Sequence, residues 1–304
     1  MFKKTLKRLK ERPLDILFIG EILIDGIHDK EGHVFLTFGG SPSNIALNVT
    51  QLGLQSRLCA AVGTDEHGDY LKRKLGHFQV DQSLIQTKKT KTSQVMLKDS
   101  KISPLPFFDR QADSEITYTP SLEKTISKCK VLHFSYWPLT KEPAKSTVLK
   151  TIKAAKDQGL LIAFDPNIHE ALKTDETIEP TELTALLKTV DMIKPSLDDA
   201  TRLFGGGYDK SEYMDFFEAY DIDLIMMTLG KEGVYVSYQK KRYLFKARVM
   251  YVIDATGAGD AFWSGFYVGL MQGKSLEETI ALAQQLSYQV LQHFGAICEL
   301  SLEK

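Results

Sequence analysis

The sequence predicts an α/β fold, a three-layer sandwich in which helices cover both faces of a mostly parallel central sheet that carries a small antiparallel β lid. Short apolar runs without period-two alternation recur along the chain, as is typical of strands buried on both faces. Stretches of helical period lie between these runs, and strand–helix–strand repetition implies a parallel sheet. Two regions instead carry β-favouring residues with no helix between them, and these predict the lid.

The predicted strands of the central sheet share a continuous apolar character, and they are residues 15–20, 56–63, 131–135, 160–165, 191–195 and 223–230. The predicted helices are residues 42–52, 142–158, 197–204 and 212–220. We expect the lid at residues 27–38 and 90–118, with an edge extension of no catalytic role as the alternative. A lid suits chemistry from which water must be excluded. One domain is expected over residues 13–304, after a basic head at residues 1–12.

Composition excludes several classes of function. Lys and Arg number 38 against 39 Asp and Glu, so no bulk charge draws the protein to nucleic acid or to an anionic membrane. No apolar run approaches the ~18 residues of a membrane span. The basic head is expected to form a short solvated helix, with an amphipathic anchor as the alternative. Three scattered cysteines predict no disulfide framework and no zinc site, which favours a reducing cytoplasm.

The sharpest motif is DATGAGDAF at residues 254–262, which opens a long predicted helix. The small residues Gly257, Ala258 and Gly259 leave backbone N–H groups unobstructed at the start of this helix, where the helix dipole also favours phosphate oxygens. Asp260 then lies in the first turn, beside the same phosphate. It is placed to accept the proton of a hydroxyl that attacks a γ-phosphate. A simple helix cap is the alternative, but a cap requires no Gly-Ala-Gly before it.

A second cluster, FGGSPSN at residues 38–44, also enters a predicted helix. Pro42 suits the first helical turn and Ser41 the N-cap. The paired glycines Gly39 and Gly40 permit close approach of a ligand to the backbone. Asn44 offers both a hydrogen-bond donor and an acceptor, as recognition of a polyol requires.

Together the two clusters resemble the signatures of the PfkB carbohydrate kinase family, whose fold is called ribokinase-like. Residues 254–262 fit the pattern D-[TSA]-[TS]-G-A-G-D-x-F throughout, and Gly39, Gly40 and Asn44 fit the N-terminal pattern. Further landmarks between them resemble the nucleotide side of the family: Lys194-Pro195, Thr228-Leu229-Gly230 and Gly233. The resemblance covers essentially the whole chain after the basic head, and in general appearance it is closest to fructokinases and related keto-sugar kinases.

This resemblance implies an ATP-dependent kinase that phosphorylates a hydroxyl of a small sugar. It implies that Asp260 is the catalytic base and that Gly257, Ala258 and Gly259 form the anion hole. The implied nucleotide-binding residues are Lys194, Thr228, Gly230, Gly233 and Thr256. The implied sugar-binding residues are Asp25, Gly39, Gly40, Asn44 and Arg110, although Asp25 precedes a glycine and a turn role is its alternative. MgATP is the implied nucleotide, and a homodimer formed through the lid is expected.

Two metal roles follow from the same resemblance. Asp254 matches a position linked to a monovalent cation such as K⁺, and Asp199 matches one linked to Mg²⁺ through water. The family pattern Asn-x-x-Glu, however, is here Ser196-Leu197-Asp198-Asp199, and His169 stands where Arg is frequent. The shorter carboxylate puts metal organisation in doubt. The alternative function is therefore a catalytically impaired protein that senses a sugar or a nucleotide.

Two further stretches affect the interpretation. Residues 104–117 resemble fructokinases, and Arg110 is then expected to approach the substrate from the lid. A guanidinium binds hydroxyls or a carboxylate, so fructose and keto-deoxygluconate-type sugar acids both remain open, as does a plain exposed arginine. Residues 269–275 resemble a P-loop but are one residue short. They predict instead a helix C-cap at Gly273 and a capping box of Ser275 with Glu278.

Overall fold

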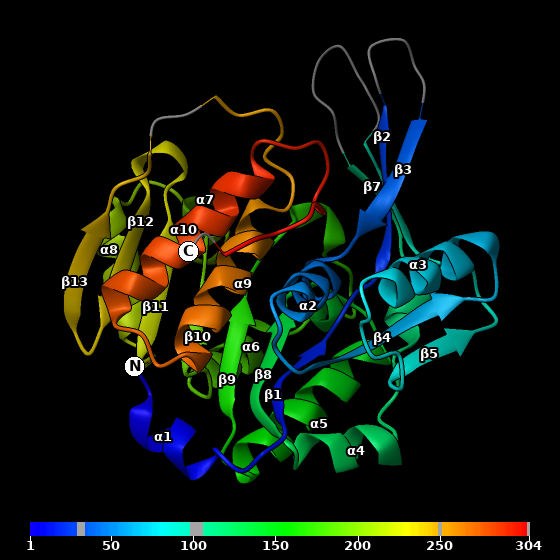
Figure 1. Ribbon diagram of the computed structural model, residues 1–304, viewed down its shortest axis with the longest axis horizontal. Coiled ribbons are helices and arrows are strands. Elements are labelled where there is room, and N and C mark those ends of the chain that lie inside the picture. The colour runs from blue at the N-terminus through cyan, green and yellow to red at the C-terminus, as the bar shows by residue number, and fades with distance from the viewer. Residues whose placement is uncertain (29–33, 98–105, 249–250, 303–304) are drawn as a thin grey trace.

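The computed structural model describes residues 1–28, 34–97, 106–248 and 251–302. Its central sheet has nine strands: β1 (Leu14–Ile19), β4 (Ser56–Gly63), β5 (Ile85–Lys88), β8 (Cys129–Ser135), β9 (Leu161–Asp165), β10 (Met192–Ile193), β11 (Leu224–Thr228), β12 (Val234–Tyr238) and β13 (Lys241–Phe245). Their order is β13-β12-β11-β10-β9-β8-β1-β4-β5 (Figure 1). Every pair from β11 to β5 is parallel, and at the other edge β12 runs antiparallel to both of its neighbours, β11 and β13.

Helices cover both faces of this sheet. One face carries α2 (Ser41–Gln51), α3 (Glu66–His77), α9 (Ala258–Met271) and α10 (Leu276–Val290). The other carries α4 (Pro120–Ile126), α5 (Ala144–Asp157), α6 (Pro180–Leu187), α7 (Leu197–Phe204) and α8 (Lys210–Glu218). Within β1, Ile16 and Phe18 pack on the first face while Leu17 and Ile19 pack on the second. Burial on both faces explains the continuous apolar runs, and the predicted three-layer α/β fold is confirmed.

A second, four-stranded sheet projects beyond the main body, beside α2 and α3 (Figure 1). It contains β2 (Leu23–His28), β3 (Val34–Gly39), β6 (Gln94–Leu97) and β7 (Pro106–Asp109), in the order β3-β2-β6-β7. The two outer pairs are antiparallel and the central pair is parallel. The regions expected to form the lid contain these strands, although β2 begins earlier, at Leu23. Residues 29–33 and 98–105 of those regions lie outside the described residues.

The predicted strands and helices lie within three residues of the observed ones. The edge strand β5 and the hairpin of β12 and β13 are additional, because their partly exposed, alternating sequences differ from the apolar runs of the centre. The capping box of Ser275 with Glu278 is confirmed, and Gly273 follows α9 with a left-handed φ of 69°. The prediction of Ser41 as N-cap is wrong. The N-cap of α2 is Gly40, and Ser41 begins the helix.

The basic head forms the short helix α1 (Lys3–Arg8). Two of its arginines dock on the main body: Arg8 donates to the carbonyl of Gly159, and Arg12 donates to those of Cys129 and Gln158. Gln158 and Gly159 follow α5, so the arginines supply donors to carbonyl groups at the end of that helix. Across the described ranges, no helix is both long enough and apolar enough to cross a membrane.

Candidate active site

A cavity of about 520 Å³ opens where the parallel strands end at their carboxyl termini. Glu21 follows β1, Asp25 lies in β2, Asp165 ends β9, Lys194 follows β10 and Thr228 ends β11. The start of α2 and the loop before α9 close the other side. Open parallel sheets bind ligands in this position, because loops and helix N-termini gather there. The cavity is therefore the candidate active site.

Asp260 lies in this cavity, in the first turn of α9. Ser41 Oγ donates a hydrogen bond of 2.6 Å to its Oδ1, and Asn44 Nδ2 donates one of 2.8 Å to its Oδ2. Burial raises the pKa of Asp260 above its ordinary value, and the two hydrogen bonds and the nearby Lys194 oppose that rise. A raised pKa makes the carboxylate a better proton acceptor at neutral pH.

The loop before α9 needs its glycines for shape. Gly257 is the N-cap of α9 in a left-handed conformation, with a φ of 78°, and a Cβ there would lie 2.5 Å from the Cα of Ala296. A Cβ on Gly259 would lie 3.4 Å from Lys194 Nζ, so that ammonium group approaches the start of the helix. The backbone N–H groups of the first turn and this cation together suit a phosphoryl group.

Asp254 and Thr256 shape the same loop. Thr256 donates to Asp254 Oδ1 from its backbone nitrogen at 3.0 Å and from its hydroxyl at 2.8 Å, and Gly295 N donates to Oδ2 at 2.9 Å. Burial raises the pKa of Asp254, but these hydrogen bonds outweigh it and hold the pKa below its ordinary value. Thr256 lines the cavity, whereas Asp254 lies behind it and ties the loop to the segment after α10.

Asp165 and Lys194 form a buried ion pair on the cavity wall, with Nζ and Oδ1 3.3 Å apart. Burial raises the pKa of Asp165 to about 7, and Lys194 opposes that rise. Because the two side chains are at most 6% exposed, the cation is held in place with little access to bulk water.

Asp199 also lines the cavity, but protein donors surround its carboxylate. Ser196 donates from its nitrogen at 2.8 Å and from its hydroxyl at 2.7 Å, and Ile168 N donates at 2.7 Å. The stretch that departs from the family pattern is thus a reciprocal capping box at the start of α7. Among the described residues, no group of three or more His, Cys, Asp or Glu side chains is arranged to hold a metal ion.

Asp25 and Gly40 line the cavity beside Asp260, on the side of the small sheet. Burial and the neighbouring Asp260 raise the pKa of Asp25 to about 7. Gly39 packs directly on Asp25, since a Cβ at this position would lie 2.2 Å from Asp25 Oδ2. Gly39 therefore supports the cavity wall, and it is not among the residues that line it.

Of the predicted nucleotide-side residues, Lys194, Thr228 and Thr256 line the cavity, whereas Gly230 and Gly233 do not. Gly230 begins a single 3₁₀ turn between β11 and β12 and Gly233 follows it, with φ of 55° and 108°. A Cβ on Gly233 would lie 2.0 Å from the carbonyl oxygen of Phe245. Close packing against β13 therefore accounts for Gly233 without a ligand.

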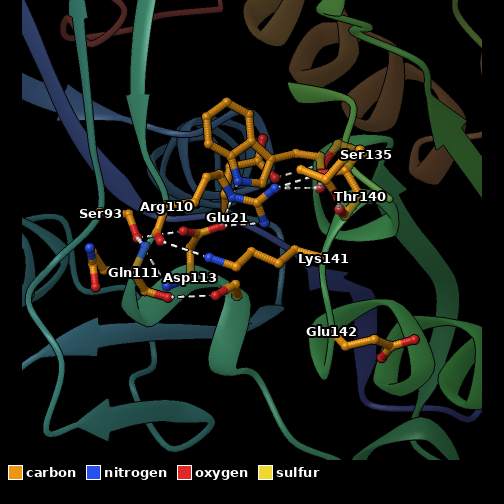
Figure 2. Close-up of polar contacts among 12 residues, drawn as sticks. Glu21, Ser93, Arg110, Gln111, Asp113, Ser135, Thr140, Lys141 and Glu142 are labelled. Carbon is orange, nitrogen blue, oxygen red and sulfur yellow. Dashed lines mark hydrogen bonds and ion pairs between the residues drawn. The ribbon is translucent and has the colours of Figure 1, made fainter. Parts of the chain in front are cut away.

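Arg110 is committed to a buried cluster instead of the cavity (Figure 2). Its Nε and Nη2 lie 2.7 and 2.6 Å from Asp113 Oδ2, and its Nη1 donates to Thr140 Oγ1 at 2.6 Å. Trp137 Nε1 and Ser93 Oγ also donate to Asp113, and the guanidinium lies 4.8 Å from the centre of the Trp137 ring. The predicted approach of Arg110 to the substrate has no support here, because its donors already face the main body.

Several cavity residues were not predicted from the sequence: Glu21, Val95, Phe108, Trp137, Asp165, Asn167, His169 and Arg202. An acidic residue at the end of a buried strand was the available signal for Asp165, and one shortly after a buried strand was the signal for Glu21. Phe108 of β7 packs edge-on against Trp137 and His169, with ring centres 5.3 and 5.4 Å apart. These rings join the small sheet to the main body, and no sequence pattern indicated their meeting.

Comparison with known proteins agrees with this geometry. The model of the pfkB family carbohydrate kinases matches residues 14–302. An ATP-dependent 6-phosphofructokinase of Thermoanaerobacterium thermosaccharolyticum is 37% identical over 95% of this chain and 92% of its own. A fructokinase of Salmonella typhimurium is 28% identical over 94% and 96% of the two chains. The structure of a fructokinase of Halothermothrix orenii superposes with a TM-score of 0.78 at 31% identity, covering 89% of this chain and 98% of that one.

The family model spans nearly all of the chain, and the relatives align over almost their full lengths. Residues of both signature motifs line one cavity, and the alternative of an impaired sensing protein gains no support from these relatives. The chain belongs to the PfkB family of carbohydrate kinases and is an ATP-dependent sugar kinase.

Proposed function

We propose that this kinase transfers the γ-phosphate of ATP to a primary hydroxyl of a ketohexose, with fructose as the acceptor. The observation that carries the proposal is the position of Asp260, which lies between a polar wall suited to sugar hydroxyls and the Gly257–Gly259 turn suited to phosphate. Asp25, Gly40 and Asn44 form the sugar side. Thr228, Thr256 and Lys194 form the nucleotide side.

In the proposed reaction, the acceptor hydroxyl gives its proton to Asp260 while its oxygen attacks the γ-phosphorus and the bond to the leaving ADP oxygen breaks. The backbone N–H groups at the start of α9 and the Lys194 ammonium stabilise the charge on the phosphoryl oxygens. The phenyl and indole rings of Phe108 and Trp137 pack over the sugar side and exclude water.

Mg²⁺ would enter with the nucleotide. The described residues offer no cage of carboxylates, and the Asp199 carboxylate already accepts three hydrogen bonds. Mg²⁺ suits such a site because it retains several waters and binds mainly to phosphates. When bound, it would neutralise phosphate charge. Asp199 then serves to hold α7, and Asp254 serves to hold the loop before α9, with activation by K⁺ left as a prediction.

A sugar acid is the less favoured acceptor. Its carboxylate was expected to meet Arg110, whose donors instead face Asp113 and Thr140. Fructose 6-phosphate is a second candidate, because the relative with 37% identity is named a 6-phosphofructokinase. Among the described residues of the cavity wall, the lysine and arginine side chains are Lys194 and Arg202. Because Lys194 is assigned to the γ-phosphate of ATP, the 6-phosphate of the sugar would have to bind Arg202.

A coupled ADP-release assay with MgATP tests the proposal directly. Fructose, fructose 6-phosphate, 2-keto-3-deoxygluconate and ribose are compared as acceptors, each with and without K⁺. We expect the highest kcat/KM with fructose. A higher value with fructose 6-phosphate would replace the acceptor and keep the reaction. A higher value with the sugar acid would contradict the ketohexose assignment.

A homodimer formed through the small sheet and a cytoplasmic location complete the proposal. Phe35 and Leu36 of β3 are 50% and 43% exposed, which supports pairing of this sheet with a second copy. Sedimentation analysis of the wild type and of the Phe35→Glu variant tests it. A wild type that sediments as a monomer at micromolar concentration contradicts the dimer.

A further inference from the structure

Glu21 is a buried carboxyl group between β1 and β2, on the wall of the cavity. It is 2% exposed. Its Oε1 accepts a hydrogen bond of 3.1 Å from the backbone nitrogen of Ser41, and its Oε2 accepts one of 2.7 Å from Ser135 Oγ. Figure 2 shows Glu21 and Ser135 beside the Arg110 cluster. Glu21 appears in none of the described ion pairs.

The first of these hydrogen bonds replaces a missing helix cap. The N-cap residue of α2 is Gly40, which has no side chain to bind the free N–H groups of the first turn. A side chain at this position is excluded, because its Cβ would lie 2.5 Å from the carbonyl oxygen of Glu21 and the φ is 103°. The carboxyl group of Glu21 therefore supplies the acceptor from a distant part of the chain.

The turn that Glu21 holds also holds Asp260. Ser41 begins this turn and binds Asp260 Oδ1, and Asn44, one turn later, binds Asp260 Oδ2. Ser41 thus uses its backbone nitrogen for Glu21 and its hydroxyl for Asp260. A shift of the first turn would displace both donors from the carboxylate together.

We propose that Glu21 is a positioning residue that fixes the first turn of α2, and through Ser41 and Asn44 fixes the orientation of Asp260. The inference rests on the proposed role of Asp260 as the base. Burial of the Glu21 carboxyl group at this position lowers the stability of the fold. Burial, with a smaller contribution from the nearby Asp113, raises the pKa of Glu21 to about 8. A buried carboxyl without a cation is unfavourable, so packing alone does not account for it.

Four variants test the inference in the purified full-length kinase. Glu21→Met keeps the volume and removes both acceptors, and Glu21→Gln keeps one acceptor for Ser41 N. Ser41→Ala removes the hydroxyl that reaches Asp260. Ser135→Ala is the matched control, because it removes the other hydrogen bond to the same carboxyl group and does not interrupt the path to Asp260. For each variant, kcat, the KM for ATP and Tm are measured.

We expect Glu21→Met to lower kcat on the order of 10²-fold, because a catalytic group displaced by about 1 Å costs that much, and to leave the KM for ATP within about threefold of wild type. Glu21→Gln should recover kcat to within about tenfold of wild type, the worth of one hydrogen bond. Adding Ser41→Ala to Glu21→Met should lower kcat by less than the product of the two single effects, since both act on one contact.

Three results would overturn the inference: a Glu21→Met variant with the kcat of Ser135→Ala, a Glu21→Gln variant as slow as Glu21→Met, or independent effects of Glu21→Met and Ser41→Ala. If Glu21→Met does not fold, the pair Glu21→Gln and Ser41→Ala still tests the inference. When the two are combined, a fall in kcat equal to the product of the two single falls would show that Glu21 does not act through Ser41. Asp260→Ala is measured alongside. Full activity of Asp260→Ala would refute the proposed base, whereas its inactivity beside a normal Glu21→Met would refute only this inference.

Discussion

Asn44 donates a hydrogen bond of 2.8 Å to Asp260 and so joins α2 to α9 across 216 positions of the chain. The carbonyl oxygen of the same amide is buried and has no hydrogen-bond partner among the described residues. A buried oxygen without a partner costs about 1–3 kcal/mol. We therefore expect a hydroxyl of the acceptor sugar to donate to it, which would place that hydroxyl beside the base.

Replacement of Asn44 tests this arrangement. Asn44→Asp exchanges the donor for a second carboxylate next to Asp260, and like charges at this distance raise the pKa of the base and repel it from its position. We expect kcat to fall on the order of 10²-fold or more. For Asn44→Ala, which adds no charge, we expect a smaller fall in kcat. Equal activity of Asn44→Asp and wild type in the ADP-release assay would contradict the contact.

Removal of the base has the largest expected effect. Asp260→Ala should fold and bind the sugar, since the loop before α9 is held by Asp254 and not by Asp260. Its kcat should fall about 10²–10⁴-fold, the usual range for a positioned base. Steady-state kinetics with fructose and calorimetric sugar binding check the two parts separately. Undiminished turnover would remove Asp260 from the mechanism.

Lys194 and Asp165 are expected to affect stability and activity differently. Lys194→Met leaves the Asp165 carboxylate buried without its cation, which should cost about 3–5 kcal/mol of unfolding free energy. Adding Asp165→Asn removes the unpaired charge and should restore most of that stability. The double variant should nevertheless remain slow, because the ammonium beside the phosphoryl site is still missing. Urea unfolding and kcat measured together test this, and a fully active double variant would show that Lys194 acts only on the fold.

Arg110 provides a test of the substrate role that the sequence suggested. In the structure it holds Asp113, so Arg110→Ala should lower the free energy of unfolding by about 3–5 kcal/mol through the unpaired carboxylate. Asp113→Asn combined with Arg110→Ala should recover part of the stability and keep the KM for fructose near that of wild type. A large rise in KM in a double variant of normal stability would return Arg110 to the sugar site.

Three buried carboxyl groups predict how stability depends on pH. The pKa of Glu21 is about 8 and those of Asp25 and Asp165 are about 7, all raised by burial above the unfolded values of 4.5 and 3.8. Between the unfolded and the folded pKa values, the folded state therefore binds more protons than the unfolded state. The stability that these groups contribute is lost as pH rises through the folded pKa values of about 7 to 8.

We expect the Tm of the ligand-free protein to be higher at pH 6.5 than at pH 8.5. The range starts at pH 6.5 because burial lowers the pKa of His133 to about 3. Below pH 6.5 this histidine takes up a proton more readily in the unfolded state, so its contribution to stability falls as pH falls. Asp25→Asn removes one of the three carboxyl groups and should flatten the slope relative to wild type. A Tm that rises with pH over this range would contradict the raised pKa values.

The sequence was sufficient for the central sheet because burial on both faces leaves long apolar runs, as in β4. It was insufficient for the hairpin of β12 and β13, because VYVSY is partly exposed and polar at Ser237 and KRYLF begins with two charged residues. It placed Asp260 and Asn44 at the starts of helices, and the fold brings both into one cavity. Local motifs of this kind are readable because their geometry is set within a few residues.

Distant contacts decide the N-cap of α2 and the hydrogen bonds of Arg110, and local sequence patterns do not contain them. Ser41 has the side chain of an N-cap, yet its hydroxyl binds Asp260 and a remote carboxyl group takes over the cap. Arg110 has the chain position of a substrate contact, yet Trp137 and Thr140 of the main body complete a binding site for it. No local sequence pattern distinguishes an arginine whose donors bind other protein groups from one whose donors are available to a substrate.

The packing of α2 on α9 also determines when the enzyme becomes complete during synthesis. Ile45 and Val49 of α2 share a core with Phe262 and Phe266 of α9, which leave the ribosome only after most of the chain. A chain released near residue 250 would contain Asp25 and Gly40 but would lack both the Gly257–Gly259 turn and α9, which packs on α2. Such a fragment would carry an exposed apolar helix and no activity, so the kinase gains its function and buries this surface in the same late step.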